Sequence, residues 1–230
     1  MTAKKALVRR PSPRLAEGIV THIAQQPVDC ELGAKQWGGY VEALEACGWE
    51  TVEVPPADDC PDGVFIEDTM VVYKDLAVIA RPGAASRKPE VVAAEAVVEG
   101  LGLSINWIRS PGTLDGGDVL KVGDSIYVGV GGRTNPAAVR QLRDGLTPLG
   151  ATVIAVPVRK VLHLKSAVTA LPDGSIIGYL PLVDEPSIFP SFRAVPEESG
   201  AHVVVLDEHR ILMAADCPRS AEMFAGLGYE

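Results

Sequence analysis

Apolar runs broken by a short polar turn recur four times along the chain. The turns are Tyr-Lys-Asp, Val-Gly-Asp, Pro-Asp-Gly and Asp-Glu-His, and the segments on both sides are rich in residues that favour strands. Two apolar strands joined by a short polar turn are typical of a β-hairpin. The pattern therefore predicts hairpins over residues 63–83, 119–129, 163–180 and 202–214.

Segments with apolar residues at three- and four-residue spacing alternate with these hairpins and predict helices. Each predicted helix is followed by a glycine, which favours a helix end, and the first three glycines are followed by an apolar strand. The predicted helices cover residues 36–47, 89–101, 136–149 and 219–227, and the predicted strands cover residues 50–54, 104–108 and 152–158.

A repeated unit of hairpin, helix and strand favours an α/β fold in which the units stack radially or as a solenoid, rather than a doubly wound sheet. Residues 6–10 form a short apolar strand with no partner nearby, so we expect them to complete the ring. Residues 182–199, which are rich in Pro, Ser and Glu, break the rhythm and predict a surface loop or a divergent helix. No long linker is evident, so a single domain over residues 1–230 is expected.

The fourth unit differs from the others after its last glycine. Only Tyr229 and Glu230 follow Gly228, where the other units continue into a strand. A strand missing from one copy of a repeat would leave an unpaired sheet edge, which natural folds avoid. The repeat therefore predicts at least one further strand after Glu230.

Composition and charge exclude several classes of protein. The net charge of −9 argues against nucleic acid as a partner, because phosphate binding needs a concentrated basic face. No apolar run approaches the ~20 residues of a membrane-spanning helix, and the basic N-terminus lacks the apolar segment of a secretion signal. The four cysteines are widely scattered and show no zinc spacing, so we expect a cytoplasmic protein with free thiols and neither a metal nor a cofactor.

Carboxylates gather in residues 61–68, which read PDGVFIED. If this segment is a strand, Asp62 and Asp68 lie on one face because side chains alternate with a period of two. Glu67 and Asp68 are embedded in apolar sequence, where an acid without a partner is costly, so a cation is expected beside them. Ordinary acids in a turn at a strand end are the alternative.

A second polar stretch, SPGTLDGGD at residues 110–118, places Asp115 and Asp118 on either side of a glycine pair. Glycine is used where backbone approaches a neighbour closely, and polar loops between apolar strands often carry function. Arg81 and Arg87 follow the first hairpin and Arg133 follows the second. Arginine forks bind carboxylates in pairs, so acids and arginines together indicate an amino-acid-like ligand with a cationic group. Salt-bridged rim arginines are the alternative.

His163 lies between leucines at the same point of its repeat that the acids occupy in theirs. We therefore expect the three groups to converge, and a histidine beside a carboxylate can act as a general acid near neutral pH. A buried histidine with only a structural role is the alternative. Cys217 precedes a predicted helix whose N-terminus could activate a thiol, although a small apolar residue at a strand end is the favoured interpretation.

Several of these motifs in this order resemble the dimethylarginine dimethylaminohydrolases, which belong to a superfamily of five-bladed α/β propellers that modify guanidino groups. The resemblance extends along essentially the whole chain. It rests on residues 61–68 (PDGVFIED), 81–87 (RPGAASR), 113–118 (TLDGGD), 132–135 (GRTN) and 163–166 (HLKS).

The resemblance implies a role for each matching residue. Asp62 would bind the substrate α-amino group, Asp68 with Glu67 the guanidinium, and Arg87 with Arg133 the α-carboxylate. His163 and Asp115 would be catalytic, with Ser166 beside them. The family nucleophile is a cysteine near the C-terminus, which would lie beyond Glu230, since none of the four cysteines here matches it. A thiolate would attack the guanidinium carbon, and citrulline and dimethylamine would be the products.

Other functions are compatible with the same fold. Arginine deiminases and amidinotransferases differ in loops that the sequence does not resolve. From another class, the chain could be a non-catalytic binding protein for arginine-like ligands, or a partner-binding module like the ribosome-binding translation factor of this fold. A homodimer is also compatible with the sequence.

Overall fold

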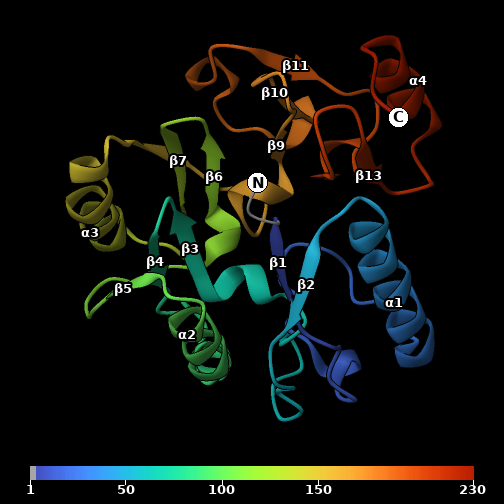
Figure 1. The fold of residues 1–230 in the computed structure, drawn as a ribbon. Coiled ribbons are helices and arrows are strands. Elements are labelled where there is room, and N and C mark those ends of the chain that lie inside the picture. The colour runs from blue at the N-terminus through green and yellow to red at the C-terminus, as the bar shows by residue number, and fades with distance from the viewer. Residues whose placement is uncertain (1–3) are drawn as a thin grey trace. The chain divides into compact units, whose positions relative to one another are not determined.

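The computed structural model describes residues 4–230, which form two compact units, residues 1–116 and 117–230. Each unit is described by itself below, and Figure 1 labels its elements. No helix in the described part of the chain is long and apolar enough to cross a membrane. Whether both units form the predicted single domain stays a prediction.

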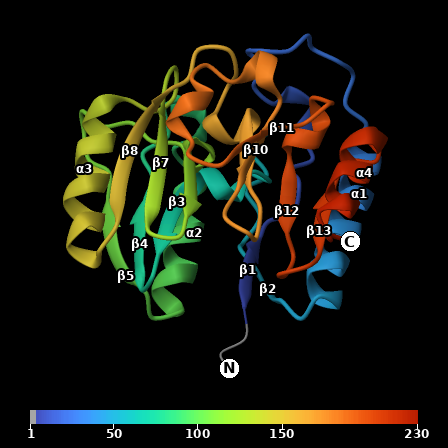
Figure 2. The ribbon, with the colours of Figure 1, turned by 90° about the horizontal axis from the view of Figure 1, so that it is seen from above.

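The first unit contains two small sheets and two helices. Strand β1 (Lys5–Val8) pairs in parallel with β2 (Glu50–Glu53), and α1 (Cys30–Ala46) connects them. Strands β3 (Met70–Tyr73) and β4 (Leu76–Ile79) form an antiparallel hairpin, and β5 (Ser104–Trp107) pairs in parallel with β4 after α2 (Glu90–Gly100). Figure 2 shows α1 beside β2 and α2 beside the β3–β5 sheet.

The second unit contains three sheets. Strands β6 (Val119–Val122), β7 (Ser125–Val130) and β8 (Thr152–Pro157) form the first, with α3 (Pro136–Leu146) between β7 and β8. Strands β9 (Val168–Ala170), β10 (Ile176–Gly178) and β11 (Phe192–Ala194) form the second. The third is the hairpin of β12 (Val203–Val205) and β13 (Ile211–Met213), followed by α4 (Pro218–Gly226).

The predicted repeat is confirmed in two complete copies, one in each unit. In both, an antiparallel hairpin is followed by a helix and then by a third strand parallel to the second, as in β3–β4–α2–β5 and β6–β7–α3–β8. The glycines predicted to end the helices, at positions 48, 102, 150 and 228, all have φ between +80° and +95°. A side chain rarely adopts this conformation, which explains why glycine follows each helix.

Three local predictions were wrong. The strand at residues 6–10 does not lack a near partner, since β1 pairs with β2 in register Lys5↔Glu50. Residues 182–199 are not simply a loop or helix, because they contain β11, which is reached through two short 3-10 turns. Helix α1 begins at Cys30 rather than near residue 36, because the Asp29 side chain accepts the backbone N–H of Leu32 (2.9 Å) and caps the helix.

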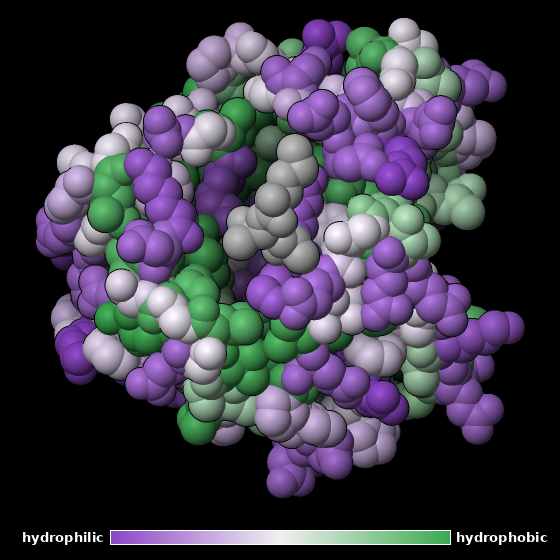
Figure 3. Space-filling model, in the orientation of Figure 1, coloured by the Kyte–Doolittle hydropathy of each residue, from purple (hydrophilic) through white to green (hydrophobic). Residues whose placement is uncertain are grey.

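Apolar side chains from the hairpins and helices form the core of each unit. In the first unit Ala77, Ile79 and Val98 pack between the β3–β5 sheet and α2. In the second unit Tyr127 meets Phe189 edge to face, with ring centroids 5.2 Å apart. On the face shown in Figure 3, charged and polar side chains are interspersed with smaller apolar areas. These cores hold the loops that carry the candidate site residues.

Candidate active site

The acids of residues 61–68 lie on a loop and a 3-10 turn (Ile66–Thr69), not on the strand expected from their alternation. The predicted common face of a strand is therefore wrong, although Asp62 and Asp68 are both buried. Asp62 accepts the backbone N–H of Ile19 through both carboxylate oxygens (3.1 and 3.3 Å). Asp62 therefore links the segment before α1 to residues 61–68, which we call the acid loop.

Asp68 has the cation that its apolar setting requires, and that cation is Arg87. Arg87 is only 4% exposed, and its Nη1 donates to Asp68 Oδ2. Its Nε and Nη2 donate to Glu90 (3.0 and 2.7 Å), and Nη2 also donates to the carbonyls of Asp62 and Phe65 (both 3.2 Å). Burial lowers the pKa of Arg87, but the hydrogen bonds and charges of Glu90 and Asp68 outweigh burial and raise it. Arg87 therefore fixes the acid loop as a permanently charged centre.

Two further buried charges, Glu90 and Arg9, belong to the same cluster and were missed from the sequence. Glu90 is 2% exposed and Arg9 is 1% exposed. Arg9 Nη2 donates to the Glu90 carbonyl (2.9 Å) and Nη1 to the Gly63 carbonyl (3.4 Å), whereas its Nε finds no hydrogen-bond partner among the described residues. Burial lowers the pKa of Arg9. Only long-range packing brings Arg9 to this cluster, because 81 residues separate it from Glu90.

Asp115 is fully buried, and its Oδ1 accepts the backbone N–H of Gly83 (2.8 Å). The next residue, Gly116, explains the glycine requirement of this stretch. A Cβ at Gly116 would lie 2.0 Å from the carbonyl oxygen of Glu67, well inside contact distance. The predicted close approach of backbone is therefore confirmed, and it brings the segment that carries Asp115 against the turn that carries Glu67 and Asp68.

His163 in the second unit is 8% exposed and lies beside a carboxylate, but that carboxylate belongs to Asp118. The distance from His163 Nδ1 to Asp118 Oδ2 is 3.3 Å. Asp118 also accepts the Thr134 hydroxyl (2.6 Å) and the backbone N–H of Leu164 (3.0 Å), so its carboxylate is fixed beside the imidazole and anchors the turn that follows His163. The GGD motif had marked Asp118 in the sequence, and Thr134 belongs to the GRTN motif at residues 132–135, although no role had been assigned to it.

Two glycines that precede Arg133 allow close packing of the backbone. A Cβ at Gly129 would lie 2.7 Å from Asp118 Oδ1, and one at Gly131 would lie 2.5 Å from the Val158 carbonyl. Arg133 itself is half-buried, directly after these glycines. These glycines therefore allow the end of β7 to approach both the Asp118 carboxylate and the backbone of Val158.

The four cysteines of this chain are free thiols. Burial raises the pKa of both Cys60 and Cys217, which disfavours the thiolate needed for nucleophilic attack. Cys217 donates to the Ala214 carbonyl and is 1% exposed, in agreement with its interpretation as a small buried residue.

The structure groups the predicted residues by unit. Within the first unit, Asp62, Asp68 and Arg87 share one buried cluster, and Gly116 holds the Asp115 segment against that loop. Within the second unit, Asp118 lies beside His163 and accepts the Thr134 hydroxyl. The convergence of residues from both units on one substrate stays a prediction.

Comparisons with known proteins establish the family. The arginine deiminase family model matches residues 53–213. The chain is 65% identical to the N(G),N(G)-dimethylarginine dimethylaminohydrolase of Streptomyces coelicolor over 230 residues, which is 100% of this chain and 89% of that protein. It is 33% identical to the enzyme of the same name from Pseudomonas aeruginosa, over 98% of this chain and 90% of that protein. The chain belongs to the dimethylarginine dimethylaminohydrolase family.

Solved structures of this family agree with the fold. A dimethylarginine dimethylaminohydrolase adduct with S-methyl-L-thiocitrulline superposes with a TM-score of 0.91 at 31% identity, over 99% of this chain and 91% of that chain. A mutant of the Pseudomonas aeruginosa enzyme complexed with citrulline gives 0.90 at 31% identity, over 100% and 91%. The predicted fold class, a five-bladed α/β propeller of repeated units, is confirmed.

Proposed function

We propose that this protein hydrolyses Nω-methylated arginines and converts dimethylarginine into citrulline and dimethylamine. The observation that carries the proposal is the 65% identity with a dimethylarginine dimethylaminohydrolase along the whole chain. The buried pair of His163 and Asp118 and the buried acid cluster around Asp68 supply the residue types that this reaction needs.

The substrate is recognised by complementary charge. Asp68, supported by Glu67, binds the guanidinium, and Asp62 binds the α-amino group. A carboxylate that is already ordered loses little conformational entropy when a ligand binds. The hydrogen bond from Arg87 orders the Asp68 carboxylate before the ligand arrives. Arg133 and Arg87 bind the α-carboxylate. For Arg87 this requires one of its present acceptors to be replaced, because its guanidinium already donates to two carboxylates and two carbonyls.

The reaction is covalent and proceeds in two halves. A cysteine thiolate attacks the guanidinium carbon, protonated His163 gives its proton to the departing nitrogen, and dimethylamine leaves. His163 then takes a proton from water, the hydroxide attacks the thiouronium carbon, and the carbon–sulfur bond breaks to release the thiolate and citrulline, whose excess proton passes to solvent. The carboxylate of Asp118 stabilises the positive imidazole during the first half, and Asp115 is the second acidic member of the catalytic set. Cys60 and Cys217 are poor candidates for this nucleophile, because both are buried and burial raises the pKa of both thiols.

The test of catalysis is a citrulline-formation assay on the natural protein with dimethylarginine. His163→Ala is expected to abolish turnover while dimethylarginine still binds, as measured by calorimetry. His209→Ala, in the exposed turn between β12 and β13, is the matched control and is expected to leave turnover unchanged. Full activity of His163→Ala would remove this residue from the mechanism.

A deiminase is the second candidate, because the matching family model is that of arginine deiminase. Comparison of kcat/KM for dimethylarginine and for arginine separates the two reactions. The proposal requires the methylated substrate to be preferred, and preference for arginine with release of ammonia would establish the deiminase. Asp68→Asn is expected to weaken binding of either ligand, and unchanged affinity would contradict the assigned role of Asp68.

The remaining expectations on partners and location are part of the same proposal. A small-molecule substrate without a nucleic-acid partner is supported by the net charge of −9, and a homodimer stays compatible with the fold. The cytoplasm is supported by four cysteines that carry free thiols.

A further inference from the structure

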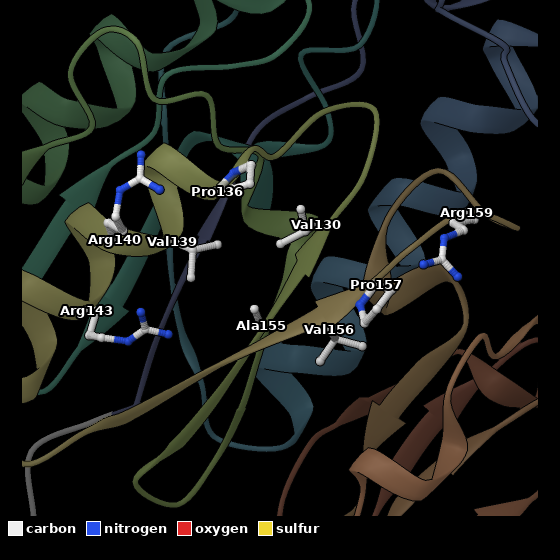
Figure 4. Close-up of a pocket in the computed structure, with 9 residues that line it drawn as sticks. All are labelled: Val130, Pro136, Val139, Arg140, Arg143, Ala155, Val156, Pro157 and Arg159. Atoms are coloured by element: carbon white, nitrogen blue, oxygen red, sulfur yellow. The ribbon is translucent and has the colours of Figure 1, made fainter.

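A cavity of about 570 Å³ lies in the second unit, between α3 and β8 (Figure 4). Helix α3 contributes four of its lining residues, β8 contributes three, and the end of β7 and the segment after β8 contribute one each. They are Val130, Pro136, Val139, Arg140, Arg143, Ala155, Val156, Pro157 and Arg159. None of them belongs to the proposed active site, so the cavity needs an explanation of its own.

All the charge on the cavity wall is positive. Arg140 and Arg143 lie on α3 and Arg159 lies across the open space, while none of the nine lining residues is acidic. Arg143 donates through Nη2 to the Val153 carbonyl (3.1 Å). The nearby Asp184 accepts the backbone N–H of Arg159 (2.8 Å) rather than its guanidinium. Within residues 4–230, the side chains of Arg140 and Arg159 make no hydrogen bond or ion pair.

This arrangement differs from the other exposed arginines of an acidic chain with 30 carboxylates and 21 basic residues. Several exposed arginines elsewhere pair with acids, as Arg10 does with Glu53, Arg14 with Glu17 and Arg219 with Glu197. A bound anion would supply the counter-charge that the guanidinium groups of the cavity do not find among the lining residues. The missing acids at the cavity therefore point to an acidic group from outside the chain.

The remaining wall is apolar and leaves room for a carbon skeleton. Val130, Val139, Val156 and two prolines line it, and Ala155 is a small, exposed residue in the middle of β8. The volume lies within the ~300–1,000 Å³ range of small-molecule sites, in which an apolar wall and a few polar groups set orientation. Guanidinium forks bind carboxylates and phosphates with two parallel hydrogen bonds.

We propose that the cavity between α3 and β8 binds a small organic anion, with its carboxylate or phosphate on one of the two rim arginines, Arg140 or Arg159, and its apolar body against the valines and Ala155. This site is separate from the proposed hydrolysis of methylated arginines and does not depend on it.

The test is titration of ¹⁵N-labelled protein with hexanoate and with hexyl phosphate, followed by amide chemical shifts. Saturable shifts are expected for residues 139–143 and 155–159. 1-Hexanol and inorganic phosphate, which carry only the apolar part or only the anion, are expected to bind at least about tenfold more weakly, because each lacks one half of the interaction. Tighter binding of one acid than of the other would support the proposal and identify the headgroup.

Variants locate the binding in the cavity. Arg140→Gln combined with Arg159→Gln is expected to weaken binding about tenfold or more, and Ala155→Leu is expected to block it by filling the space. Arg219→Gln, on exposed α4, is the matched control and is expected to bind like the unmodified protein. Thermal melting checks that each variant is folded. The absence of saturable shifts, equal binding of 1-hexanol or inorganic phosphate, or full binding by the double variant would each overturn the proposal.

Discussion

Replacement of Gly116 by alanine tests the close approach that organises the acid loop. The added Cβ would lie 2.0 Å from the Glu67 carbonyl oxygen, and 3.0 Å from both the Glu67 carbonyl carbon and the Met70 carbonyl oxygen. Carbon and oxygen atoms in contact are about 3.3 Å apart, so one of the two segments must move by roughly 1.3 Å. The obstacle is backbone, which cannot rotate away as a side chain can.

The expected cost follows from that geometry. Overpacking typically costs about 1–3 kcal/mol, and a fixed backbone obstacle places Gly116→Ala at the upper end, near 3 kcal/mol. The same shift displaces Glu67 and Asp68, so we expect the affinity for dimethylarginine to fall at least about tenfold as well.

Gly38→Ala is the matched control, because it makes the same chemical change within α1 where no atom lies within 4 Å of the new Cβ. Alanine is preferred over glycine in a helix by about 1 kcal/mol, so this variant is expected to gain stability. Urea unfolding followed by circular dichroism measures both variants, and calorimetry measures binding. Equal stability of the two variants, or unchanged binding by Gly116→Ala, would refute the steric argument.

Three further predictions concern buried and capping charges. Asp118→Asn removes the negative charge 3.3 Å from His163 Nδ1 but keeps an acceptor oxygen, so kcat in the citrulline assay should fall by about 10²-fold or more with little change in KM. Glu90→Gln leaves Arg87 without one of its two buried counter-charges, and urea unfolding should show a loss of about 3 kcal/mol. Asp207 has its pKa lowered to about 2 by the backbone N–H of His209 and by Arg210, so its contribution to stability is present above pH ~4 and lost between pH ~4 and ~2. Asp207→Asn should remove that part of the acid dependence of the melting temperature.

Each of these predictions has an outcome that contradicts it. For Asp118, a variant that keeps wild-type kcat would show that the carboxylate does not assist His163. For Glu90, the exposed acid Glu17, which pairs with Arg14 on the surface, is the control. Glu17→Gln should not change unfolding measurably, and the same small effect at Glu90 would mean that its burial is unimportant. For Asp207, parallel melting curves of variant and wild type from pH 4 to pH 2 would contradict the lowered pKa.

The sequence by itself determined the repeated unit, the ends of the helices and the family. These features depend on local patterns, namely the alternation of apolar residues, a glycine after each helix, and short motifs such as TLDGGD. It also indicated that Asp68 needs a cation and that His163 has a carboxylate beside it. The first expectation concerns the cost of burying charge, which apolar neighbours in the sequence already indicate, and the second rests on the matching positions of His163 and the acids in the repeat.

Only the tertiary structure decided which partners these residues have. The pairing of β1 with β2, the burial of Arg9 against Glu90, and the choice of Asp118 beside His163 all join residues 45 or more positions apart. The acids of residues 61–68 have an alternation that suggests a strand, yet they lie on a loop and a 3-10 turn held by Arg87. The preference of a short segment for strand or helix contributes little to the free energy of folding. Burial and pairing of charges across the fold contribute more at these positions and therefore decide the local structure.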